Sequence, residues 1–162
     1  MCMHPYHVLF DQLLTSTYRS VLRVEAEMLR SLSGSDLSIS EMHMLESIGK
    51  DAHGATITDI AQDQAITLPT VTTAIQKLEK KGYVTKEKSA KDARCVRVVL
   101  SETGRRAEVA HRYFHRQMVK AMIGDLSETE RESLMEGLRK LDVFLRERAE
   151  AGSMRFQGGA DT

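Results

Sequence analysis

The strongest structural signal in this chain is Leu68-Pro69-Thr70-Val71-Thr72-Thr73-Ala74-Ile75-Gln76-Lys77-Leu78-Glu79-Lys80-Lys81-Gly82, which follows a short helical pattern at residues 58–61 and a turn. Two runs rich in β-branched residues, 83–85 and 95–100, then flank a charged tip at residues 86–94. Helix, turn, helix and basic hairpin in this order are typical of a winged helix-turn-helix, whose second helix enters the DNA major groove. The sequence therefore predicts a mainly α fold with a small β-wing (α+β).

One face of the helix at residues 68–81 is apolar and the other is polar. At 100° per residue, Val71, Ala74, Ile75 and Leu78 share the face that we expect in the core. The opposite side carries the candidate DNA-binding residues Pro69, Thr70, Thr73, Gln76, Lys77 and Lys80. The threonines and the glutamine suit base edges, whereas the lysines, with Lys81 at the helix end, suit phosphates.

The tip of the hairpin is cationic. Lys88, Lys91 and Arg94 are candidate backbone contacts, and Arg94 could enter a narrow minor groove. Asp92 cannot bind phosphate, so we expect it to brace the wing by pairing with Arg94. The alternative for Asp92 and Arg94 is a salt bridge with a structural role only.

Charge is distributed unevenly, although the net charge is zero. Residues 68–97 carry 8 Lys/Arg against 3 Asp/Glu, whereas residues 1–67 carry 4 against 9. Such a local basic patch is what binding to double-stranded DNA requires. No apolar run approaches the roughly 20 residues of a membrane span, and two distant cysteines suggest no disulfide framework, so we expect a cytoplasmic protein.

Long helical patterns flank the winged segment. The last one repeats leucines at Leu134, Leu138, Leu141 and Leu145, a seam typical of a helix that packs against a partner helix. We expect residues 1–151 to form a single domain, with the winged helix at about 37–100 and dimerisation helices at about 6–32 and 102–150. The chain would then be a homodimer, and residues 152–162 a disordered tail.

The chain resembles the MarR family of bacterial transcription regulators. The resemblance rests on Thr70-Val71-Thr72, the run from Leu78 to Val84, and Asp92-Ala93-Arg94 followed by Val98-Val99-Leu100-Ser101-Glu102-Thr103-Gly104. Ala93 departs from an arginine common in the family. The resemblance covers nearly the whole chain and implies a DNA-binding regulator that is not an enzyme. We expect it to recognise a pseudo-palindromic operator and to act as a repressor.

Within the family, three stretches resemble the branch that represses fatty-acid biosynthesis: residues 39–43, 67–73 and 111–119. This resemblance implies long-chain acyl carrier protein as the effector and partner. An acyl pocket would suit flexible side chains, and the candidate lining residues are Met28, Met42, Met44, Met118 and Met122. The alternative is that these methionines fill the core.

His111 and His115 are four residues apart, so both rings lie on one face of a helix and could hold one zinc ion. In zinc-responsive repressors of the same family a similar His pair joins a Glu and another His, and here Glu25 and His43 stand at the matching positions. A polar network or surface histidines are the alternatives. No cofactor is required for DNA binding, and a zinc hydrolase is a distant alternative.

Overall fold

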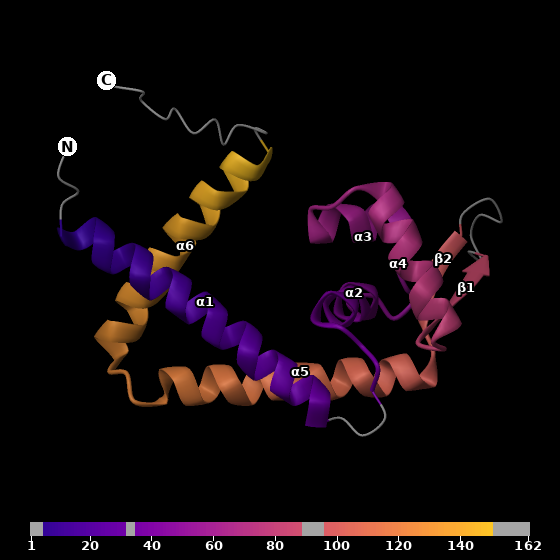
Figure 1. Ribbon diagram of the computed structural model, residues 1–162, viewed down its shortest axis with the longest axis horizontal. Coiled ribbons are helices and arrows are strands. Elements are labelled where there is room, and N and C mark those ends of the chain that lie inside the picture. Colours follow the sequence, from indigo (N-terminus) through magenta and orange to yellow (C-terminus); the bar gives the residue numbers. More distant parts are fainter. Residues whose placement is uncertain (1–4, 32–34, 89–95, 151–162) are drawn as a thin grey trace. The chain divides into compact units, whose positions relative to one another are not determined.

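The computed structural model describes residues 5–31, 35–88 and 96–150, which form six helices and one two-stranded antiparallel sheet (Figure 1). The elements in chain order are α1 (Pro5–Ser31), α2 (Ile39–Gly49), α3 (Ile57–Gln64), α4 (Leu68–Lys80), β1 (Val84–Lys88), β2 (Val96–Leu100), α5 (Glu102–Gly124) and α6 (Glu128–Glu150). This order confirms the predicted winged helix-turn-helix. Within these described ranges, no helix is both long enough and apolar enough to cross a bilayer.

Local sequence signals begin three of the helices. Ser38 accepts from the amide of Glu41, whose carboxylate accepts in turn from the amide of Ser38, and α2 starts there. Thr56 and Asp59 make the same reciprocal pair at the start of α3. Ser127 does so with Glu130 before α6. Each capping box satisfies amides that the first helical turn leaves without partners.

The turn between α3 and α4 depends on one residue in an unusual conformation. Ala65 ends α3 with φ 52° and ψ 40°, in the left-handed region. Its amide donates to the carbonyls of Ala61 and Gln62, which closes the helix end. Pro69 then lies in the first turn of α4, where a proline removes no helical hydrogen bond. Gly82, with φ 81°, follows the last residues of α4, as expected for a left-handed residue after a helix.

The first wing strand differs from the prediction. We expected residues 83–85 as strand and residues 86–94 as the tip, but β1 runs from Val84 to Lys88 and pairs with β2 in the register Val84↔Leu100 to Lys88↔Val96. Charged residues therefore occupy strand positions in β1. Backbone pairing with the mostly apolar β2 holds these residues in the sheet. A bridge between Ala55 and Val98 adds a third, single-residue segment to the sheet.

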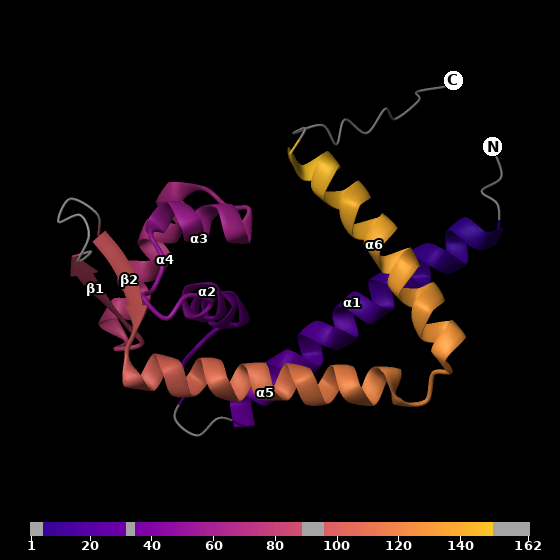
Figure 2. The same cartoon turned by 180° about the vertical axis from the view of Figure 1, so that it is seen from behind.

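The core lies where α2, α3, α4 and the sheet meet, and Figures 1 and 2 show these elements gathered together. α1 contributes Met28 and Leu29 to it. Its fully buried apolar residues are Met42, Leu45, Ile48, Ile60, Val71, Ile75, Leu78, Val84 and Val98. The predicted apolar face of α4 is confirmed, since Ala74, the remaining member, is half-buried against this core.

The chain divides into two compact units, Met1–Arg116 and Gln117–Thr162. The first contains α1 to α4, the wing strands and most of α5; the second contains the end of α5 and all of α6. The helix-turn-helix and the metal-ligand candidates His43, His111 and His115 therefore all belong to the first unit.

Candidate functional site

The outer face of α4 is a continuous exposed surface. Pro69, Thr70, Thr73 and Lys77 line a shallow depression there together with the half-buried Ala74. These are four of the residues that the sequence predicts for DNA contact, and Gln76 and Lys80 are exposed on the same helix. The short side chains of Thr70, Thr73 and Ala74 in this lining leave room for base edges to approach the helix.

The hydroxyl groups of this face are partly committed to the helix itself. Thr73 donates its hydroxyl hydrogen to the carbonyl of Pro69 at 3.0 Å, and the hydroxyl of Thr70 shares a 2.8 Å hydrogen bond with that of Thr67. The oxygen of Thr73 therefore remains an acceptor, and its methyl group remains an apolar contact. In the major groove an acceptor suits the amino groups of adenine or cytosine, and a methyl suits thymine.

The lysines at the end of α4 have different surroundings. Lys77 and Lys80 are exposed, and no carboxylate of the described residues forms an ion pair with them. Lys81 instead donates to the carboxylate of Glu41 at 2.9 Å and to the carbonyl of Asp36 at 2.7 Å. The hydrogen bond to Glu41 raises the pKa of Lys81, so its charge is held by the start of α2. Lys77 and Lys80 are thus better placed for phosphate than Lys81.

The wing is only partly described. Lys88 is exposed at the end of β1, whereas Lys91, Asp92 and Arg94 lie outside the described residues. The base of the wing is held by Arg97, for which the sequence predicted no role. Its guanidinium donates to the carbonyls of His53 and Gly54 and pairs with Asp51 at 3.3 Å. No local motif marks this contact, because its partners precede Arg97 by more than forty residues.

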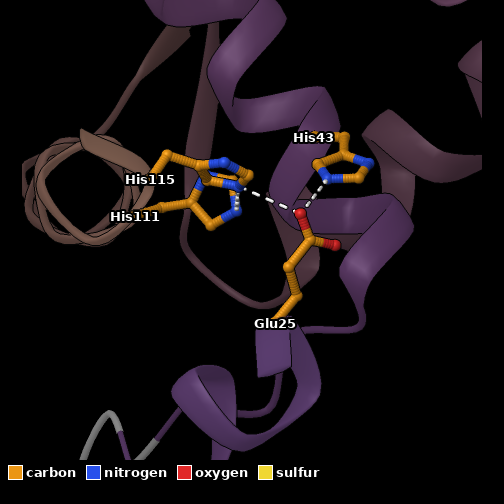
Figure 3. A group of neighbouring side chains, drawn as sticks. All are labelled: Glu25, His43, His111 and His115. Atoms are coloured by element: carbon orange, nitrogen blue, oxygen red, sulfur yellow. Dashed lines mark hydrogen bonds and ion pairs between the residues drawn. The ribbon is translucent and has the colours of Figure 1, made fainter. Parts of the chain in front are cut away.

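The structure also brings together Glu25 of α1, His43 of α2, and His111 and His115 of α5 (Figure 3). One oxygen of Glu25 lies 3.0 Å from Nε2 of His115 and 3.6 Å from Nε2 of His43. The Nε2 atoms of His111 and His115 are 3.2 Å apart. One ligand atom from each of the four residues lies within 4.8 Å of the others.

Burial makes this cluster chemically unusual. Glu25 and His111 are 3% and 1% exposed, and His43 and His115 are half-buried. Burial lowers the pKa of His111 to about 4, helped by the neighbouring His115 and His43 and opposed by Glu25. At neutral pH its imidazole is therefore uncharged, as a metal ligand must be. The second oxygen of Glu25 and Nδ1 of His111 are buried without a hydrogen-bond partner.

The donor set fits a divalent transition metal. Three imidazoles and one carboxylate are zinc ligands, and two atoms bound to one tetrahedral zinc lie about 3.4 Å apart. The contacts of 3.0, 3.2 and 3.6 Å are near that spacing. The second oxygen of Glu25, buried without a hydrogen-bond partner, is a further donor atom that such an ion could take.

Comparison with known proteins places these features in a family. The MarR family model matches residues 37–96. The structure of Streptococcus pneumoniae FabT in complex with DNA superimposes with a TM-score of 0.82 at 35% identity, covering 87% of this chain and 98% of that one. The chain belongs to the MarR family. Its class is therefore that of DNA-binding transcription regulators, which are not enzymes.

One curated protein and one further solved structure are also similar to the chain. YwhA of Bacillus subtilis (strain 168), an uncharacterized HTH-type transcriptional regulator, is 30% identical over 90 residues; the match spans 55% of this chain and 65% of that protein, just under two thirds. The S. aureus MepR–DNA complex shares the fold at 23% identity and a TM-score of 0.64, covering 86% of this chain and 96% of that one.

The methionines predicted for an acyl pocket in this MarR-family chain have mixed environments. Met28, Met42 and Met44 are buried in the core cluster, where they pack against other apolar side chains. In the second unit, Met118 is half-buried and Met122 is 56% exposed. The core positions agree with the alternative of ordinary core packing, and an acyl pocket stays a prediction.

Proposed function

We propose that this MarR-family regulator binds a pseudo-palindromic operator as a homodimer and represses transcription from it. The observation that carries the proposal is the outer face of α4, where Thr70, Thr73 and Lys77 surround one exposed depression. Each recognition helix would enter a major groove, with half-sites about one helical turn apart. The wing, with Lys88 at its described end, would follow the adjacent backbone.

The homodimer is supported by apolar residues that the single chain leaves in solvent. On α1, Leu9, Phe10 and Leu13 are each more than half exposed. On α6, Leu138 and Leu145 are 50% and 52% exposed. Large apolar faces of this kind mark association surfaces, and a closed twofold dimer covers the same face on both copies.

The first candidate effector is long-chain acyl carrier protein. The sequence resemblance to fatty-acid-biosynthesis repressors supports it as the ligand that changes operator affinity. Such an effector would act by altering the spacing of the two recognition helices, because half-sites have a fixed separation on DNA.

A second candidate effector is zinc, and the cluster of Glu25, His43, His111 and His115 favours it. All four side chains offer ligand atoms in one place, and three elements of the first unit supply them. A bound ion would join α1, α2 and α5 at this point. Because α2 also contacts α3 and the wing strand β2, the ion would be coupled to the DNA-binding elements.

The test is operator affinity by fluorescence anisotropy, using DNA from upstream of the chain's own gene and of fatty-acid-synthesis genes. The titration is run alone, with long-chain acyl carrier protein, and with zinc against a chelator. Tightening by the acylated carrier alone would support the lipid effector and leave the histidines a structural role. A response to zinc alone would support the metal effector. Binding no tighter than to unrelated DNA would refute sequence-specific recognition of these regions.

A further inference from the structure

One buried nitrogen is not explained by the ligand cluster itself. His111 is only 1% exposed, and its ring nitrogen Nδ1 is buried without a hydrogen-bond partner. The other ring nitrogen, Nε2, faces His115 at 3.2 Å and is the atom that a shared cation would take. Leaving a buried polar nitrogen without a partner is unfavourable, so a nearby acceptor is expected to serve it.

Glu46 is the acceptor within reach. Its carboxylate oxygen Oε2 lies 3.9 Å from Nδ1 of His111, too far for a hydrogen bond and close enough for a small side-chain rotation to make one. Glu46 stands three residues after His43 on α2, so both side chains leave the same face of that helix. Its side chain is 44% exposed, which lets it move without first breaking a buried contact.

The tautomer of His111 links these two positions. A cation on Nε2 requires that nitrogen to be unprotonated, so the neutral ring must carry its hydrogen on Nδ1. Metal-bound histidines usually donate this second N–H to a carboxylate, a carbonyl or water, which orients the ring and strengthens the ligand. Among the described residues, Glu46 has the only carboxylate that an ion-pair contact places beside Nδ1.

We propose that Glu46 is a positioning residue for the cation site: it accepts the Nδ1–H of His111 and thereby holds Nε2 toward the ion. This inference rests on the zinc candidate proposed above. Closing from 3.9 Å to hydrogen-bond distance would fasten α2 to α5 by a charge-assisted bond when the ion binds. The ion would then join these helices twice, through His43 as a ligand and through Glu46 behind His111.

The experiment measures zinc affinity of the full chain by competition with a chromophoric chelator. Four proteins are compared: the parent, Glu46→Ala, Glu46→Gln and the control Glu102→Ala. Glu102 is an exposed carboxylate on α5 that pairs with Arg106. Glu102→Ala removes one negative charge, as Glu46→Ala does. We expect Glu46→Ala to weaken zinc binding on the order of 10–100-fold, and Glu102→Ala to leave it unchanged. Glu46→Gln should retain most of the affinity, because its amide oxygen still accepts.

A spectroscopic readout separates positioning from general stability. Nitrogen-15 NMR of the histidine rings should show the Nδ1–H resonance of His111 in the zinc-loaded parent and in Glu46→Gln, and its loss in Glu46→Ala. Circular dichroism of the zinc-free variants controls for folding. Parent-like affinity and an intact resonance in Glu46→Ala would overturn the inference, as would an equal loss in Glu46→Gln. A parent chain that binds no zinc would remove the metal candidate itself, with operator binding tested separately.

Discussion

The missing side chain of Gly104 allows α5 to start directly against the wing. A Cβ built on Gly104 would lie 2.0 Å from the carbonyl oxygen of Tyr83, a distance that no real contact tolerates. Ser101 fastens the same junction: its amide donates to Tyr83, its hydroxyl donates to Gly82, and its oxygen accepts from Gly104. The pattern Leu-Ser-x-x-Gly at the end of the wing thus has a steric and a hydrogen-bonding cause.

Gly104→Ala should therefore destabilise the chain by about 2–3 kcal/mol, because the helix must shift away from Tyr83. The measurement is the free energy of unfolding in denaturant at fixed protein concentration. Gly137→Ala is the matched control, since a Cβ at that position in α6 meets nothing within 4 Å. It should be neutral or slightly stabilising, as expected for replacing a glycine inside a helix. Equal effects of the two substitutions would contradict the steric account.

Ala65 makes the opposite prediction. Its left-handed conformation is unfavourable by roughly 1–2 kcal/mol for a residue with a Cβ, and glycine removes that penalty while adding freedom to the unfolded chain. We expect Ala65→Gly to raise the free energy of unfolding by about 0.5 kcal/mol. The same substitution at Ala121, in α5 with a right-handed backbone, should lower it by roughly 1 kcal/mol. Destabilisation by Ala65→Gly would contradict the prediction.

At the scale of elements, the recognition helix α4 is held at its end by the start of α2. Lys81 bonds to Glu41, and Glu41 is also the carboxylate that caps Ser38. Partial burial acts to raise the pKa of Glu41, but the hydrogen bonds from Ser38 and Lys81 together lower it, so the carboxylate is charged at neutral pH. One residue therefore begins α2 and anchors α4.

The salt dependence of operator binding can separate Lys81 from its neighbour Lys77. Removing one lysine–phosphate interaction reduces the slope of log affinity against log salt by about 0.9. We expect Lys77→Ala to reduce the slope by about that amount. Lys81→Ala should leave the slope nearly unchanged, although affinity falls because α4 is no longer anchored to Glu41. If Lys77→Ala and Lys81→Ala reduced the slope equally, Lys81 would contact phosphate, as the sequence suggests.

Elements with local signals could be predicted from the sequence. The capping residues Ser38, Thr56 and Ser127 and the glycine after α4 belong to short local motifs, which neighbouring residues alone determine. The full length of β1 could not be predicted in this way, since its charged residues are held by pairing with β2.

The candidate sites, too, contain some features that the sequence predicts and others that it does not. The outer face of α4 follows from helical periodicity, and the four metal-ligand candidates, suggested by resemblance, lie together in the structure. The anchors Lys81–Glu41 and Arg97–Asp51 join residues 40 and 46 positions apart, and no spacing in the sequence marks them. Contacts of this kind depend on tertiary packing, which a single sequence does not display.

At the scale of the whole molecule, the proposed recognition of a pseudo-palindromic operator would depend on two copies of α4. One recognition helix reads one half-site, so a pseudo-palindrome is bound tightly only when both copies are joined. In the second unit, the leucine seam of α6 places Leu134 and Leu138 in solvent at 43% and 50% exposure. Such a seam is better explained by a partner helix than by solvent.

Leu138→Glu should therefore convert the dimer to a monomer, because a carboxylate in an apolar seam is strongly unfavourable when buried. Arg139→Glu is the control, since it places the same side chain on the neighbouring position of α6. Light scattering after size exclusion measures the mass, and anisotropy measures affinity for a full operator and for one half-site. We expect Leu138→Glu to weaken binding to the full operator on the order of 100-fold or more and binding to the half-site little, because each α4 remains intact. If Leu138→Glu stayed dimeric with full operator affinity, a charge at this position would not disturb dimerisation, and the dimer interface would lie elsewhere than this seam.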